Sequence, residues 1–103
     1  MSYLSEFPDY DGKLYIPEGF KDNSWHNDTM PKAEKVVTIP TYPAGTEIEV
    51  AFIIWQDYTD PELREYEDGK RYIFQINVNE NPVFEYQTDD LSTIEMFVEC
   101  IDD

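Results

Sequence analysis

Basic residues are scarce in this sequence, and histidine and cysteine are nearly absent. Only 7 lysines and arginines accompany 23 aspartates and glutamates, so the formal net charge is −16. The acids run along the whole chain and form no separate tail. A surface this negative repels phosphate backbones and anionic lipid headgroups, and it attracts basic protein surfaces or divalent cations. We therefore expect neither direct nucleic-acid binding nor membrane binding.

The chain also has no second cysteine and no long hydrophobic run. Cys100 is the only cysteine, which excludes an intramolecular disulfide and fits a reducing compartment. The longest apolar run, VAFIIW at 50–55, is far too short to span a bilayer. The start, MSYLSEFPDYDG, has no basic region followed by an apolar run, so it does not resemble a signal peptide. These features predict a cytoplasmic protein.

Residues suited to catalysis or metal binding are few. There is no phosphate-binding or dinucleotide-binding glycine motif, and the chain has only 4 glycines. His26 is the only imidazole, and Cys100 lies beside an apolar stripe where a thiol is usually inert. Asp22, His26 and Asp28 are a conceivable metal set, but their spacing matches no zinc or EF-hand pattern. We expect no enzyme, no catalytic residue, no metal and no cofactor.

Aromatic residues, in contrast, are abundant. The chain of 103 residues is 41% hydrophobic and 16% aromatic, which predicts one folded domain and not an acidic tail. Residues 1–34 are rich in Pro, Gly, Asn and Asp with isolated aromatics. We expect an irregular segment that its aromatics pin to the core, a disordered arm being the alternative. Residues 35–103 should then supply the sheet and a C-terminal helix.

Alternating hydrophobic residues predict strands at 35–40, 46–58, 71–78 and 83–87. In the second of these, Ile48, Val50, Phe52 and Ile54 share one face. The opposite face starts with acids but continues with Ile53 and Trp55, so its second half should be covered too. We attribute that cover to the helix.

The end of the chain shows helical spacing of apolar residues, at Leu91, Ile94, Phe97, Val98 and Ile101. Thr88 or Asp89 is the expected N-cap. A strand is the competing interpretation, because TIEMFVEC also contains β-branched and aromatic residues. The predicted fold class is α+β: a small antiparallel sheet of three to four strands, a C-terminal helix packed on one face, and a long irregular N-terminal segment.

The stretch DNSWHNDTMP, residues 22–31, contains the only histidine and one of the two tryptophans. Its Asn, Asp and Ser side chains are suited to bonds that shape turns. We expect an ordered loop that Trp25 anchors in the core. The alternative is a loop that contacts a partner, since tryptophan is favoured at binding hot spots.

The most informative polar segment is DYTDPELREYEDG, residues 57–69, in which acids alternate with aromatics and Arg64 is the only base. One interpretation is a solvated loop. The functional interpretation is a docking surface on which acids attract a basic partner and tyrosines supply contact area. The predicted partner-binding residues are Asp57, Tyr58, Asp60, Glu62, Glu65, Tyr66, Glu67 and Asp68. Five further acids extend this surface if the sheet brings them near: Glu47, Glu49, Glu85, Asp89 and Asp90.

Two classes of function fit these features. The first is a small acidic inhibitor that binds the basic surface of another protein. In its sharpest form it is a nucleic-acid mimic that blocks the cleft of a nuclease or another nucleic-acid-handling enzyme, and in a milder form it is an immunity protein or antitoxin. The second is an accessory or structural domain of a larger complex that binds through aromatic contacts, its acidity being incidental. Steep loss of affinity with salt distinguishes the first class from the second.

Overall fold

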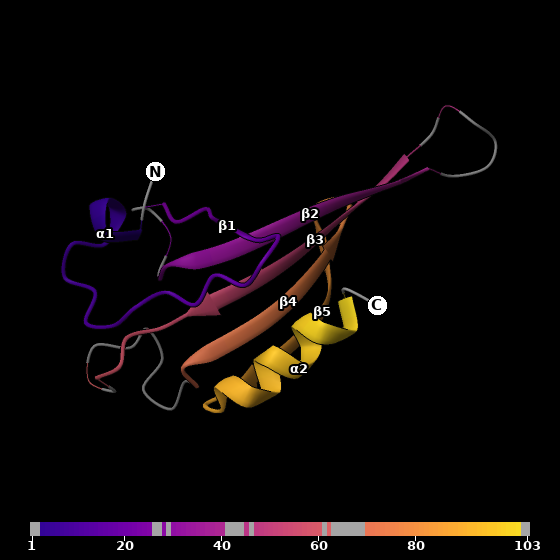
Figure 1. Ribbon diagram of the computed structural model, residues 1–103. Helices are drawn as coiled ribbons and strands as arrows, with labels where there is room; N and C mark the ends of the chain where they lie inside the picture. Colours follow the sequence, from indigo (N-terminus) through magenta and orange to yellow (C-terminus); the bar gives the residue numbers. More distant parts are fainter. Residues whose placement is uncertain are drawn as a thin grey trace.

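The computed structural model describes residues 3–25, 28, 30–40, 45, 47–60, 62 and 70–101. Its strands form one five-stranded antiparallel sheet in the order β1-β2-β3-β4-β5 (Figure 1). The elements are α1 (Tyr3–Glu6), β1 (Lys21–Asp22), β2 (Lys32–Pro40), β3 (Glu47–Gln56), β4 (Tyr72–Val78), β5 (Asn81–Thr88) and α2 (Leu91–Ile101). The α+β class is therefore confirmed. None of the described helices is long and apolar enough to cross a membrane.

The sheet has five strands, so the expected count of three to four was too low. The additional strand is β1, whose two residues Lys21 and Asp22 pair with Glu34 and Ala33 of β2. A two-residue strand carries no alternation of its own, and its pairing depends on contacts distant in sequence. β2 also begins at Lys32 and not at Lys35. The strand therefore starts inside the segment that the sequence predicted to be irregular.

Two of the sheet's features follow directly from local sequence. Pro40 is the last residue of β2, as expected for a residue that cannot donate to a strand ladder. β4 and β5 are joined at Asn79 and Glu80, whose φ angles are 49° and 70°. Two successive left-handed residues are typical of the tight turns that match the twist of a hairpin.

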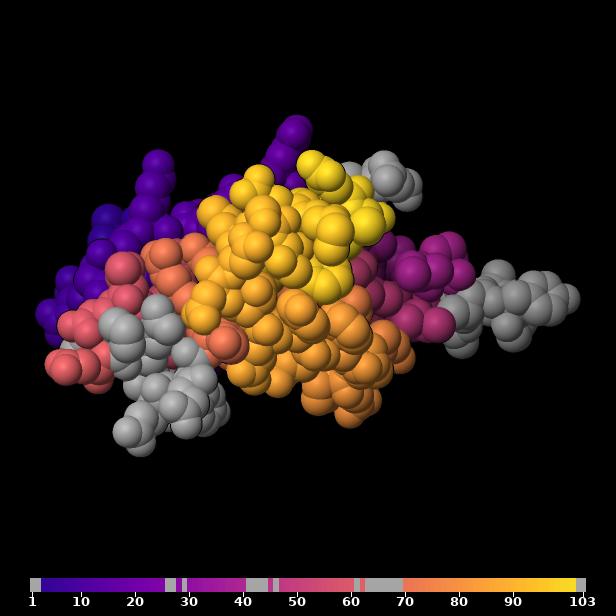
Figure 2. Space-filling model, turned by 90° about the horizontal axis from the view of Figure 1, so that it is seen from below, coloured from indigo at the N-terminus to yellow at the C-terminus, as the bar shows by residue number. Residues whose placement is uncertain are grey.

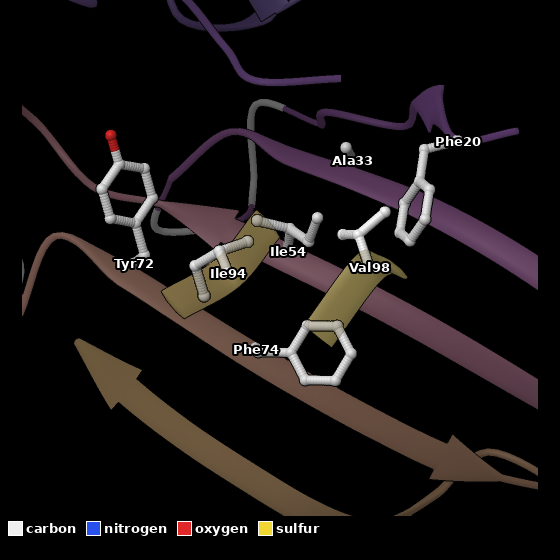
Figure 3. Packing of buried hydrophobic residues seen from close by; sticks show 7 residues of the cluster. All are labelled: Phe20, Ala33, Ile54, Tyr72, Phe74, Ile94 and Val98. Carbon is white, nitrogen blue, oxygen red and sulfur yellow. The ribbon is translucent and has the colours of Figure 1, made fainter. Parts of the chain in front are cut away.

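The core lies on one face of the sheet, where α2 and the N-terminal chain lie together. Ile94 and Val98 of α2 pack with Ile54 of β3 and Phe74 of β4, and Phe20 of the N-terminal chain lies beside Val98 (Figure 3). Seven buried residues form this cluster: Phe20, Ala33, Ile54, Tyr72, Phe74, Ile94 and Val98. α2 therefore covers the face that carries Phe52 and Ile54.

The expectation that the helix covers Ile53 and Trp55 was wrong. In a strand, neighbouring side chains point to opposite faces, so these two residues lie on the face away from α2. Ile53 is nevertheless buried. On that face the Trp55 indole N–H donates to Gln75 Oε1 at 2.9 Å, and Lys32 Nζ lies 4.8 Å from the centre of the Trp55 ring. Long neighbouring side chains thus cover part of this face in place of a helix.

The C-terminal segment is helical, so the competing strand interpretation was wrong. Its N-cap is Asp90 and not the expected Thr88 or Asp89. Asp90 Oδ1 accepts hydrogen bonds from the Ser92 backbone N–H at 3.0 Å and the Ser92 hydroxyl at 2.7 Å. These bonds hold the pKa of Asp90 below its ordinary value. Thr88 Oγ1 instead accepts the Asp90 N–H at 3.0 Å, which fixes the approach to the helix.

Candidate functional site

In the described part of residues 22–31 Ser24 is buried, and the expectation that Trp25 anchors this loop in the core was wrong. Trp25 is 46% exposed, whereas Ser24 and Met30 are almost completely buried. The Ser24 hydroxyl accepts the Lys32 N–H at 3.1 Å and donates to the Lys32 carbonyl at 3.4 Å. Because the Ser24 hydroxyl bonds both the N–H and the carbonyl of Lys32, it fixes Ser24 against the start of β2. The role of Trp25 as a partner contact stays a prediction.

Asp22 serves the local backbone. Its Oδ1 accepts the Ser24 N–H at 3.1 Å, and its Oδ2 accepts the Tyr3 N–H at 2.6 Å. Asp28, the other carboxylate of the conceivable metal set, lies 3.4 Å from Lys32 Nζ. His26 lies outside the described residues. Within the part of the chain that the structure describes, no three His, Cys, Asp or Glu side chains are grouped to hold a metal ion.

The predicted docking segment meets the N-terminal chain at one end of the sheet. The Asp11 carboxylate accepts the Thr59 N–H at 2.8 Å and the Asp60 N–H at 2.9 Å, across 48 and 49 residues of sequence. Asp60 Oδ1 in turn accepts the Glu62 N–H at 3.0 Å. Five residues gather here, and we call them the acid–tyrosine end: Asp9, Asp11, Tyr58, Asp60 and Glu62.

The tyrosine of this end lies in a negative field. Burial raises the pKa of the Tyr58 hydroxyl, and the charges of Asp9, Asp11 and Asp57 raise it further. The group therefore stays protonated far above neutral pH and remains a hydrogen-bond donor. The Tyr58 ring contacts the Tyr10 ring edge-on, at 5.2 Å between centroids. The tyrosine is thus held in place, and the four acidic residues of this end are exposed to solvent.

Asp57 is buried, although the sequence predicted it as a partner-binding residue. It is 1% exposed. Its backbone N–H donates to the Arg71 carbonyl at 2.7 Å, and its carbonyl accepts the Tyr10 hydroxyl at 3.0 Å. Its Oδ1 accepts the Tyr58 N–H at 2.8 Å. Asp57 therefore links Arg71, the residue before β4, to Tyr10 of the N-terminal chain. Its carboxylate also holds the backbone of Tyr58.

A glycine allows the two chain segments to approach this closely. A Cβ atom at Gly12 would lie 2.9 Å from a guanidinium nitrogen of Arg71 and 3.0 Å from Thr59 Oγ1. A larger residue at Gly12 would therefore require the ends of the Arg71 and Thr59 side chains to move. The Arg71 guanidinium lies 5.2 Å from the centre of the Tyr72 ring.

The remaining predicted residues are distributed differently. Glu65, Tyr66, Glu67 and Asp68 lie outside the described residues. Tyr58, Asp60 and Glu62 are described, and Asp60 Oδ1 accepts the Glu62 N–H; their role in binding a partner stays a prediction. The approach of Asp9 and Asp11 to this segment was not predicted. The signal was weak but present, because PDYDG at 8–12 repeats the alternation of acid and tyrosine found in DYTD at 57–60.

Of the five acids proposed to extend the surface, Glu47, Glu49 and Glu85 do not converge on it. Asp89 lies near this end of the sheet, where its Oδ1 accepts the Arg71 N–H at 2.9 Å and its Oδ2 lies 3.5 Å from Lys70 Nζ. Glu47 and Glu49 lie at the opposite end of β3, about 30 Å from Tyr58 at roughly 3.3 Å per strand residue. Glu85 lies in the middle of β5. Only the end that carries Asp89 and Asp90 adjoins the acid–tyrosine end.

No known protein family, curated protein or solved structure matches this chain.

Proposed function

We propose that the protein is an acidic inhibitor that binds the basic surface of another protein through its acid–tyrosine end. The observation that supports this most directly is that Asp9 and Asp11 lie near Tyr58 and that the Asp11 carboxylate is bonded to the backbone of the segment that carries Asp60. Exposed carboxylates attract a basic partner over a distance, and a fixed aromatic residue supplies contact area once the surfaces meet. The net charge of −16 adds a field of the same sign over the whole molecule.

The partner class that best fits this surface is an enzyme that handles nucleic acid. Such enzymes bind phosphates with clustered lysines and arginines. Carboxylates held at fixed positions can occupy those side chains and so compete with the nucleic acid itself. The proposal includes no catalysis by this chain and no cofactor, and it places the protein in the cytoplasm, where its single cysteine stays reduced.

The test begins with recovery of the partner. Immobilised protein is incubated with a lysate of its source organism, and bound proteins are eluted with rising salt and identified by mass spectrometry. The proposal predicts a nuclease or another nucleic-acid enzyme that elutes as salt rises, since exposed charge pairs are screened. Addition of the purified protein should then inhibit that enzyme, and added DNA or RNA substrate should relieve the inhibition by competition.

Two results would contradict the proposal. One is a partner that stays bound at high salt and whose activity is unchanged, which would favour an accessory subunit of a larger complex. The other is inhibition that excess substrate does not relieve, because a mimic and a nucleic acid compete for one cleft. The exposed aromatic residues of β5 are the observation that favours the accessory-subunit alternative.

A further inference from the structure

β5 is an edge strand with an unusually apolar outer surface. Among the described strands it pairs with β4 alone, since it is last in the strand order. Residues 81–87 are all exposed. Val83, Phe84 and Tyr86 are 61%, 42% and 45% exposed, which is high for side chains of this size. An exposed strand edge presents unpaired backbone N–H and C=O groups that can pair with another chain.

Most of this edge has none of the features that usually protect one. Proline, lysine and bulges discourage pairing at sheet edges. In β5 the proline is Pro82, and the register shift between Ile76 and Asn77 leaves Val83 as the extra residue next to it, so both features lie at the start of the strand. The stretch 83–88 contains no proline and no basic residue. The opposite edge differs: β1 pairs only with Ala33 and Glu34, and the part of β2 beyond it carries Lys35 and ends at Pro40.

α2 supplies an aromatic wall beside this edge. Phe97 stacks on Phe74 at 4.9 Å between centroids and contacts the rings of Phe84 and Tyr86 at 6.1 and 5.5 Å. Figure 2 shows α2 and β5 side by side on this surface of the molecule. A strand added next to β5 would find apolar contacts on the side of the sheet that faces the helix.

The charge of this half of the chain selects the partner. Residues 72–103 contain no lysine, arginine or histidine, and they contain eight acids. Among these, Glu85 lies between Phe84 and Tyr86 in β5. Because side chains alternate along a strand, Glu85 points to the opposite face from the two aromatic residues. A second copy of this chain would bring the same negative charges together, whereas a basic segment would be attracted.

We propose that the β5 edge binds an extended, basic segment of a partner protein as a sixth strand. The segment would alternate apolar residues, packed on Phe84, Tyr86 and Phe97, with lysines or arginines that face Glu85. Backbone hydrogen bonds to β5 would supply part of the affinity. The apolar contacts on one face of the added strand and the charge contacts on the other would supply specificity. This surface shares no residue with the acid–tyrosine end, so each site can be tested without the other.

The test uses a blocked peptide of about eight residues that alternates valine and lysine, matched to the length of β5. It is titrated into the isotope-labelled full chain and followed by amide chemical shifts. Two controls carry N-methyl groups either on every valine or on every lysine. Only one set of peptide N–H groups faces the edge in a given pairing, so one methylated peptide should bind at least about tenfold more weakly. The shift changes should centre on residues 83–88.

A matched pair of variants tests whether the charge of Glu85 contributes to peptide binding. Glu85→Lys should weaken the peptide by about tenfold. Glu47→Lys makes the same change in charge at the start of β3, where Glu47 pairs with Pro40 of β2, and should leave the affinity within about twofold. Equal affinity for both methylated peptides, or shift changes that avoid β5, would overturn strand addition. Sedimentation of the free chain as a dimer that buries 83–88 would assign the edge to a second copy and also overturn the proposal.

Discussion

Asp11 connects the two chain segments of the acid–tyrosine end. Desolvation alone would raise the pKa of its carboxyl group. The N–H groups of Thr59 and Asp60 outweigh that effect by hydrogen bonding to the charged form, so the pKa lies below its ordinary value of 3.8. A group whose pKa falls on folding stabilises the fold above the pKa of the unfolded chain. That contribution is lost as pH falls through the lower pKa of the folded state.

Replacement of Asp11 by alanine should therefore destabilise the protein in a pH-dependent way. We expect a loss of about 1 kcal/mol in the free energy of unfolding near neutral pH, kept small because water can replace part of the two bonds at an exposed site. The difference from the wild type should shrink as pH falls below about 3.8. Urea denaturation of both proteins at several pH values measures it. A difference that persists unchanged at low pH would show that the carboxylate charge is not responsible.

Single residues were the hardest feature to predict from the sequence. Trp25 is large and apolar, which favours burial, yet the structure exposes it and buries Ser24. The reason is that Ser24 makes two hydrogen bonds with the backbone of Lys32. Lys32 is eight residues away, so no local sequence pattern predicts these bonds. Asp57 is similar, since its burial depends on Tyr10 and Arg71 from other parts of the chain.

At the scale of elements, Gln56 holds the N-terminal chain on the sheet. It is the last residue of β3 and is 1% exposed. Its Oε1 accepts the Tyr15 N–H at 2.9 Å, and its Nε2 donates to the Lys13 carbonyl at 2.7 Å. Residues 13–15 run as irregular backbone here, so this amide replaces the bonds that a neighbouring strand would make.

Gln56→Ala should release this segment. We expect a loss of about 2 kcal/mol in the free energy of unfolding, because two polar backbone groups near the core lose their partner. Trypsin cleavage after Lys13 under native conditions should become faster at the same time. Gln75→Ala is the control, since it removes one bond to Trp55 on the other face of the sheet and should leave cleavage at Lys13 unchanged. Destabilisation without faster cleavage would show that Gln56 does not act through the N-terminal chain.

The elements themselves were largely predictable, because their signals are local. Alternation located the four longer strands, and spacing of Ile94, Phe97 and Val98 located α2. The N-cap of α2 was predicted wrongly because Thr88, Asp89 and Asp90 all carry suitable oxygens, and only the geometry selects Asp90. The prediction of which face of the sheet α2 covers failed for a different reason. Ile53 and Trp55 looked as apolar as Phe52 and Ile54, and the cover provided by Lys32 and Gln75 is not visible in a hydrophobic pattern.

At the scale of the whole molecule, charge should limit stability. A net charge of −16 on a sheet domain with extents of 50 × 26 × 23 Å produces self-repulsion in the folded state that an expanded chain relieves. Added salt screens that repulsion. We expect NaCl to stabilise the fold by about 1 kcal/mol between low and high concentration, which corresponds to a rise of roughly 4–8 °C in Tm. Thermal unfolding at graded NaCl measures this, and a Tm that is constant or falls with salt would contradict it.

The candidate site was predictable in part. Composition located Tyr58, Asp60 and Glu62, because acids and tyrosines alternate within one segment. Asp9 and Asp11 were missed, since their approach requires the N-terminal chain to return across the end of the sheet. A sequence shows which segments carry a suitable chemistry, but the meeting of two such segments depends on the fold.

The most direct test of the proposed function compares two charge-matched variants against the partner recovered by salt elution. Asp9→Lys with Glu62→Lys changes the acid–tyrosine end, and Glu47→Lys with Glu49→Lys changes the opposite end of the sheet. Each pair replaces two carboxylates by two ammonium groups, so both proteins carry −12 instead of −16. We predict that the first pair weakens binding by about a hundredfold and the second by less than about fivefold at low salt. Equal losses would show that only the overall field matters and would contradict a binding site at the acid–tyrosine end.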